Sequence, residues 1–157
     1  MQILIRSIKA AKNEIQANIK QIKIIIISSY SSDIETVNKK NKLLLTFDDI
    51  AANRSNGFNK THAKKIINFI NTINFNKYIL YVCCDSGESR SAAIAASILK
   101  KYKKSDLSIW NNCNYHPNTF IYKMLCDEMG LKISPLQVKI KKYINNRALK
   151  NKIKHNK

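Results

Sequence analysis

The chain has 157 residues, enough for one domain with a substantial core, and its apolar fraction of 45% is ordinary for a soluble globular protein. No apolar run approaches the roughly 18 residues that a membrane span needs, and the N-terminal residues lack the pattern of a secretion signal. These features argue against a membrane-spanning or secreted protein. We therefore expect a cytoplasmic chain whose four cysteines stay reduced.

The formal net charge is +18, and half of it lies in residues 131–157, which contain nine basic residues and no acidic residue. A charge of this size favours contact with polyanions, such as nucleic acid or acidic membranes, through the basic C-terminal segment. The whole chain is also rich in Lys, Asn and Ile, so the same bias can reflect composition alone.

The first half of the chain predicts three strands. Residues 1–8 alternate loosely between apolar and polar side chains, and Lys9–Lys20 follows as a helix with apolar residues near one face. Ile22–Ser28 is apolar throughout its middle, as expected for a strand covered on both faces. A polar loop at 28–42 then leads to the strand Leu43–Phe47.

The second half predicts helices around one more strand. Asn59 or Thr61 is expected to cap a helix with one apolar face, and His62 is expected on its solvated side. Tyr78–Cys83 predicts a buried strand, because its residues are β-branched and aromatic. Ser91–Tyr102 is apolar almost all round and predicts a buried helix.

Another helix is expected at Pro117–Met129, with Pro117 in its first turn and Gly130 ending it. Strands that alternate with helices predict an α/β fold with a mainly parallel central sheet flanked by helices on both faces. We expect one such domain over residues 1–135 and a basic helix or tail over 136–157. In this last segment a short apolar stripe is expected from Ile140, Tyr143, Ile144 and Leu149.

One loop carries the chemistry. Cys84, five further residues, Arg90 and Ser91 lie between a predicted strand and a predicted helix. Backbone N–H groups of such a loop, together with the positive end of the helix dipole, form a site for an anion. Gly87 permits the tight backbone, and Arg90 offers a planar fork to two phosphate oxygens. The expected phosphate-binding residues are Asp85, Ser86, Gly87, Glu88, Ser89 and Arg90.

The same positive field favours the thiolate of Cys84, which is then a nucleophile toward phosphorus. Attack gives a phosphocysteine, and Ser91 can donate a hydrogen bond to the sulfur when it leaves. The hypothesis requires a sulfur that opens onto the mouth of the loop, so a buried sulfur would argue against an enzyme. Asp48 and Asp49 are the candidate general acids, because they follow a strand that is predicted to lie beside the strand leading into the loop. We expect no cofactor and no metal.

Three motifs resemble the cysteine-dependent phosphatases of the dual-specificity and protein-tyrosine phosphatase superfamily. CDSGESRS resembles the phosphate loop, LLLTFDDI the strand and acid-bearing loop, and HPNTFIYKML the Pro-Asn segment with its helix. The resemblance runs from about Leu43 to Gly130. It implies hydrolysis of phosphotyrosine or of other phosphoprotein esters, and it implies four catalytic residues: Cys84 as nucleophile, Arg90 as phosphate clamp, Ser91 as hydroxyl assisting the thiolate, and Asp49 as general acid.

Two departures from that family bear on activity. Cys83 stands where the family usually has His, and Glu88 stands where relatives often have an apolar residue. Glu88 and Asp85 put two carboxylates in a loop meant for a dianion, and either one pointing inward would weaken phosphate binding. Two other functions therefore stay open: a pseudophosphatase that binds phosphorylated partners without turnover, and a phosphatase acting on RNA 5′ ends. A zinc site at Cys113 and His116 is less favoured, because no second paired motif accompanies it.

Overall fold

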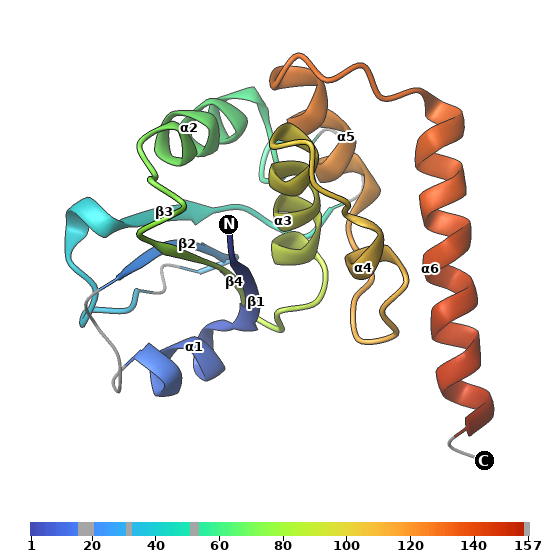
Figure 1. Cartoon of the computed structure of the whole chain (residues 1–157), viewed down its shortest axis with the longest axis horizontal. Helices are drawn as coiled ribbons and strands as arrows, with labels where there is room; N and C mark the ends of the chain where they lie inside the picture. Colours follow the sequence, from blue (N-terminus) through green and yellow to red (C-terminus); the bar gives the residue numbers. More distant parts are fainter. Residues whose placement is uncertain (16–20, 31–32, 51–53, 156–157) are drawn as a thin grey trace.

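The computed structural model describes residues 1–15, 21–30, 33–50 and 54–155. Their elements follow one another as strands and helices in alternation, with helices alone after the fourth strand (Figure 1). In chain order they are β1 (Ile3–Ser7), α1 (Ile8–Ile15), β2 (Ile22–Ser28), the short 3-10 helix η1 (Lys39–Asn41), β3 (Lys42–Thr46), α2 (Lys60–Asn71), β4 (Ile79–Cys84), α3 (Arg90–Lys101), α4 (Leu107–Trp110), α5 (Thr119–Glu128) and α6 (Pro135–His155).

The four strands form one parallel sheet in the order β1-β4-β2-β3. The strand β4 lies between β1 and β2, and Cys84 is its last residue, paired with Ser7 of β1 and Ile27 of β2. The prediction that the strand before Asp48 and Asp49 lies beside the loop's strand is wrong, because β2 separates β3 from β4. Because all strands run the same way, their carboxyl ends meet at one edge of the sheet. The predicted α/β fold with a parallel central sheet is confirmed, and it places Cys84 at that edge.

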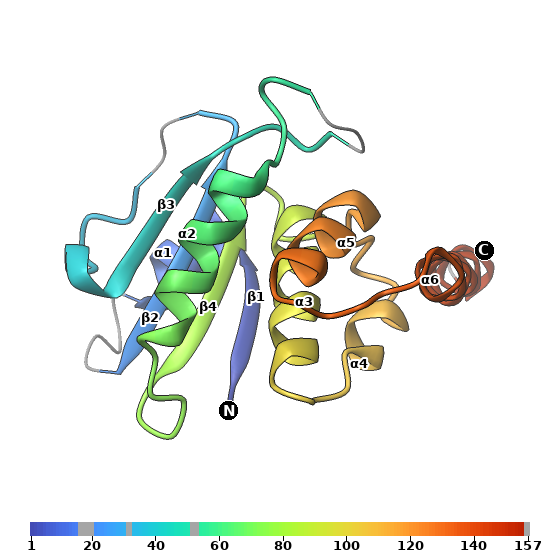
Figure 2. The same ribbon diagram turned by 90° about the horizontal axis from the view of Figure 1, so that it is seen from above.

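Helices cover both faces of the sheet, as predicted. Helix α1 lies on one face, and α2, α3 and α5 lie on the other (Figures 1 and 2). The apolar run of β2 divides between two cores, because neighbouring residues of a strand point to opposite faces. Ile25 and Ile27 are buried under the α2 and α3 layer, whereas Ile24 and Ile26 are buried against α1.

At helix α2 the expected cap is confirmed, but the expected place of His62 is wrong. Helix α2 is capped by Asn59, and His62 closes a capping box with it by accepting the Asn59 N–H through Nδ1. The His62 ring is half-buried and lies 4.9 Å from the Phe47 ring, so it is not on a solvated side. Burial and the nearby Lys65 lower its pKa. His62 lies on the polar side of α2 in the sequence pattern, but its imidazole packs on the Phe47 ring just after β3.

Helix α5 begins at Thr119 rather than at Pro117. The side chain of Asn118 accepts from the main-chain N–H groups of Phe120 and Ile121 and so caps the helix. Helix α4 and η1 had no counterpart among the predicted elements, because short helices lack a full period of apolar side chains. The predicted helix Lys9–Lys20 ends at Ile15 within the described chain, and residues 16–20 lie outside the described residues.

The basic C-terminal segment forms α6, which lies beside α4 and α5 and away from the sheet (Figure 2). Its inner face is held by Lys141, whose Nζ is 2.7 Å from a carboxylate oxygen of the buried Asp106. Trp110 and Tyr122 donate to the other oxygen of Asp106 at 3.0 Å. Asn145 donates to the main-chain oxygen of Trp110.

The apolar stripe expected on this segment is only partly present. Ile144 and Leu149 are partly buried, but Ile140 and Tyr143 are 51% and 69% exposed, because the inner face is built around Lys141 and Asn145 instead. Among the helices described, none is long and apolar enough to cross a membrane.

Candidate active site

Cys84 ends β4 and begins the loop that leads into α3. Its Sγ lies 3.1 Å from Oγ of Ser91 and accepts the main-chain N–H of Gly87 at 3.2 Å. The residue is 1% exposed, so the expectation of an openly exposed sulfur is wrong. The loop curls over the sulfur, and the Gly87 amide points at it. By the criterion set out from the sequence, this burial weighs against an enzyme, so catalysis requires that an anion reach the sulfur through the loop.

Gly87 is required at the top of the loop for two reasons. Its φ of +80° lies in the left-handed region that side chains disfavour. A Cβ at this position would also lie 2.4 Å from the main-chain nitrogen of Ser7 and 2.5 Å from the carbonyl carbon of Arg6. The loop therefore packs directly on the end of β1, and glycine alone fits there.

Arg90 is 6% exposed and lies at the start of α3. Its Nη1 donates to the main-chain oxygen of Phe47 at 2.8 Å and to Oγ of Ser29 at 3.1 Å, and its Nη2 is 2.5 Å from Asp85. The ends of β2 and β3 thus fix the guanidinium. Its Nε is buried and has no hydrogen-bond partner among the described residues. A buried donor left unpaired is costly, so this N–H is available for an oxygen of a bound anion.

The two carboxylates of the loop have different positions. Asp85 accepts from Oγ of Ser28 at 2.9 Å and from the N–H of Ser29 at 3.4 Å, in addition to Arg90. Burial acts to raise the pKa of Asp85, but the hydrogen bonds from Arg90 and Ser28 outweigh it and hold that pKa below its usual value. Glu88 instead lies 3.4 Å from Nε2 of His116, and its side chain is 48% exposed. One carboxylate therefore holds the arginine, and the other faces the segment before α5.

The first turn of α3 is not capped by a side chain, because Ser89 at the N-cap makes no side-chain capping bond. The main-chain oxygen of Ser89 instead accepts from Ala93 and, at 3.5 Å, from Asn118. The N-terminal amides of a helix attract anions through their free N–H groups and the helix dipole. The loop from Cys84 to Ser91 thus combines a helix terminus, an inward amide and a buried guanidinium in one place.

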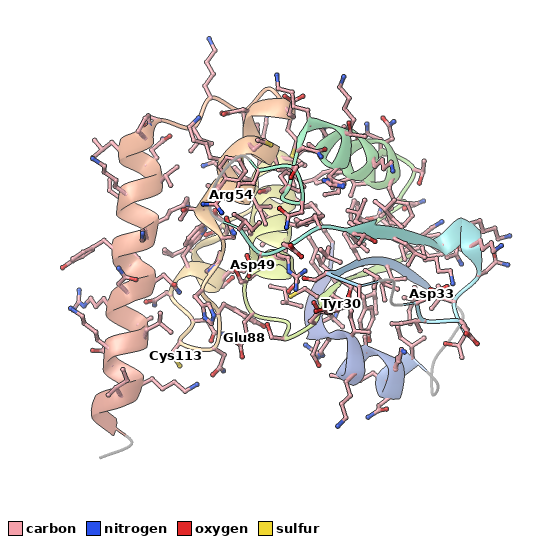
Figure 3. The ribbon with its side chains drawn as sticks, turned by 180° about the vertical axis from the view of Figure 1, so that it is seen from behind. Tyr30, Asp33, Asp49, Arg54, Glu88 and Cys113 are labelled. Carbon is pink, nitrogen blue, oxygen red and sulfur yellow. The ribbon has the colours of Figure 1, made fainter. Side chains whose placement is uncertain are left out.

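The two candidate general acids differ in their partners. Asp48 is tied to Asn56, which donates to its carboxylate and also accepts its N–H at 2.8 Å. Asp49 is exposed, and its Oδ1 accepts from Nδ2 of Asn118 at 2.7 Å. In Figure 3, Asp49, Tyr30 and Glu88 lie around the edge of the sheet that carries the loop. Asp49 is thus the more exposed of the two carboxylates, and its role as the acid stays a prediction.

Asn118 lies in the Pro-Asn segment noted above, but its contact with Asp49 was not predicted. Its Nδ2 donates to Asp49 and to the main-chain oxygen of Ile50, and its main-chain N–H reaches Ser89 of the loop. It therefore joins the acid-bearing segment to the phosphate loop. The sequence feature that could have indicated its role is an asparagine next to the start of a helix, because asparagine is a preferred N-cap residue.

Cys83 occupies the other face of the sheet, where it is fully buried in the α1 core. Burial and the adjacent Cys84 raise the pKa of its thiol strongly, so it stays neutral. All four cysteines are free. Within the described chain no group of three or more His, Cys, Asp or Glu side chains is arranged to hold a metal ion, Cys113 and His116 included.

The structure is similar to solved structures of other proteins. It matches the PTP-2 phosphatase of Cydia pomonella with a TM-score of 0.61 and 14% sequence identity, over 80% of this chain and 84% of that one. It also matches PTPMT1, alone with a TM-score of 0.44 over 98% and 95% of the two chains, and in complex with PI(5)P with a TM-score of 0.46 over 96% and 94%, both at 15% identity. No protein-family model and no curated protein matches the sequence. The match to PTP-2 shows that this chain has the fold of that phosphatase.

Proposed function

We propose that the chain hydrolyses phosphomonoesters through a phosphocysteine at Cys84. The observation that supports the proposal is the buried, unpartnered Nε of Arg90 in a loop whose Gly87 amide donates to the Cys84 sulfur. Such donors suit the oxygens of a phosphoryl group, which the Cys84 thiolate would attack at phosphorus. The same proposal assigns the chain to the cytoplasm, where thiols stay reduced.

Two steps complete the reaction. In the first, the Cys84 thiolate forms a bond to phosphorus, the bond from phosphorus to the ester oxygen breaks, and Asp49 gives that oxygen a proton. In the second, the Asp49 carboxylate takes a proton from water, the water oxygen attacks phosphorus, and the phosphorus–sulfur bond breaks. Ser91, 3.1 Å from the sulfur, donates a hydrogen bond to it as it leaves. Inorganic phosphate is released.

Phosphotyrosine in a protein is the first substrate to try. The ring of Tyr30 is 82% exposed, and its main-chain N–H bonds Oγ of Ser28, the residue that also holds Asp85. An aromatic side chain next to the loop offers a surface on which the ring of an aryl phosphate can pack. Such packing would favour an aryl ester over a smaller alkyl ester. Dual specificity is the broader proposal.

The test is vanadate-sensitive turnover of an aryl phosphate and of a phosphotyrosine peptide. Cys84→Ser should abolish turnover, and Asp49→Asn should slow it by about 100-fold or more, the usual scale for losing a general acid. Asp48→Asn is the matched control, because it changes the neighbouring carboxylate, and it should stay close to wild type.

Other results would redirect the proposal. If Asp48→Asn is impaired and Asp49→Asn is not, the acid assignment is wrong. If the wild type binds the peptide without turnover, the pairing of Asp85 with Arg90 favours a phosphate-binding pseudophosphatase instead. Faster phosphate release from 5′-phosphorylated RNA than from the peptide would favour the RNA substrate.

A further inference from the structure

The outward face of α6 carries cations that the fold does not use. Lys139, Lys142, Arg147 and Lys150 are exposed, and none of them takes part in an ion pair or hydrogen bond found among the described residues. The helix is anchored by other side chains, above all by Lys141 on Asp106. No acidic residue follows Glu128 in the sequence. The positive charge on this face is therefore available to a partner.

Exposed apolar side chains lie among these cations. Leu136 is 65% exposed, Ile140 51% and Tyr143 69%. Their spacings of four and three residues put them on one side of the helix, so they form a continuous apolar patch. Contiguous exposed apolar surface marks an interaction site more often than isolated apolar residues do.

The combination of charges and apolar groups identifies the partner. A nucleic acid would bind the lysines and the arginine through its phosphates but would leave Leu136 and Ile140 in water. The surface of an anionic bilayer accepts both, because its headgroups attract the cations while the apolar side chains enter the boundary with the acyl chains. Long lysine and arginine stems reach from that boundary to the headgroups.

We propose that this outward face of α6, formed by the four cations Lys139, Lys142, Arg147 and Lys150 and the apolar residues Leu136, Ile140 and Tyr143, docks on an anionic lipid bilayer. The inner face of α6 stays packed on α4 and α5, so the whole domain is carried to the surface without unfolding. The docking does not depend on the proposed phosphatase activity, because none of these residues belongs to the loop from Cys84 to Ser91.

Co-sedimentation of the full chain with lipid vesicles tests this docking. Vesicles of phosphatidylcholine alone are compared with vesicles containing about 30% phosphatidylserine, at physiological salt of about 0.15 M. Binding is expected only to the anionic vesicles. Each cation near such a surface contributes about fivefold to partitioning, so neutralising four should lower binding by about 100-fold or more. That variant replaces with Gln the residues Lys139, Lys142, Arg147 and Lys150.

A matched control loses the same charge elsewhere: Gln replaces Lys9 and Lys12 on α1 and Lys64 and Lys65 on α2, all exposed. It should keep binding within a few-fold of wild type, since charge away from the docking face is largely screened. Replacing Leu136, Ile140 and Tyr143 with Ser should also weaken binding, and circular dichroism should find both α6 variants folded.

Three results would overturn the proposal. The first is equal binding to neutral and anionic vesicles, and the second is equal loss in the α6 charge variant and its control. The third is α6-dependent binding of single-stranded RNA without binding to vesicles, which would make this face a nucleic-acid site. All of these readouts are obtained without substrate, so failure here leaves the phosphatase proposal intact, and failure of turnover leaves the docking proposal intact.

Discussion

At the scale of single residues, Asn118 joins three parts of the site. Its Oδ1 caps α5, its Nδ2 holds Asp49 at 2.7 Å, and its main-chain N–H reaches Ser89 of the phosphate loop. An exposed carboxylate on a loop samples many rotamers unless a partner holds it. If Asp49 is the general acid that we propose, Asn118 is a positioning residue that acts through it.

The variant Asn118→Ser separates positioning from folding. Serine is a good N-cap, so α5 keeps its cap, but the donor to Asp49 is lost. We expect turnover of an alkyl phosphate, whose leaving group needs a proton, to fall by about 10-fold, a fraction of the full effect of a general acid. The initial burst of leaving group from an activated aryl phosphate, which reports the first step alone and needs no proton, should change much less. Equal losses on both substrates would mean that Asn118 supports only the structure.

At the scale of elements, the unit made by β4, the loop and α3 is the part of the site that its sequence specifies most completely. The local geometry of the loop agrees with its spacing: the Gly87 amide donates to the Cys84 sulfur, Gly87 is left-handed, and the Ser91 hydroxyl lies on the sulfur. These are local features, because a strand, a tight turn and a helix start fix them within eight residues. The catalytic roles of these residues stay predictions.

Other parts of the site depend on contacts distant in sequence. The guanidinium of Arg90 is held by Ser29 and by the main chain of Phe47, which lie 61 and 43 residues away. No pattern in the sequence links these residues, because every residue has a main-chain oxygen and its type does not reveal which one will accept a hydrogen bond. The side-chain direction of Glu88 was equally open, and only the position of His116 explains why it turns away from the loop. His62 was misjudged for the same reason, since its aromatic neighbours come from outside its own helix.

Helix α6 depends on one buried ion pair, that of Asp106 with Lys141. The side chains of these residues are 7% and 16% exposed. Replacing Asp106 with Ala leaves a partly buried ammonium and two donors, from Trp110 and Tyr122, without their acceptor. We expect the free energy of unfolding to fall by about 3–5 kcal/mol in a urea titration.

The matched control for this prediction is Lys139→Met, which removes a lysine from the outward face of the same helix. It should change the free energy of unfolding by no more than about 0.5 kcal/mol, as exposed substitutions usually do. A loss from Asp106→Ala as small as that of the control would mean that α6 is held mainly by its apolar contacts.

At the scale of the whole molecule, the order of the strands assembles the site. The sheet order β1-β4-β2-β3 puts the loop of β4 between the end of β1, which contacts Gly87, and the end of β2, which holds Asp85. The end of β3 supplies the contact to Arg90 and continues into the segment with Asp49. The candidate site therefore exists only in the assembled sheet. The alternation of strands and helices predicted a parallel sheet, but it did not predict which strands lie side by side in it.

The most direct test of the account is the identity of the residue that carries phosphate during turnover. In Asp49→Asn, an activated aryl phosphate can still transfer its phosphoryl group to the sulfur, but hydrolysis lacks its base, so the intermediate should accumulate. Acid quenching followed by peptide mass spectrometry should find one phosphoryl group on Cys84, and none in a variant that also has Cys84→Ser. Turnover with no phosphoryl group on Cys84, or with the group on another residue, would contradict the account.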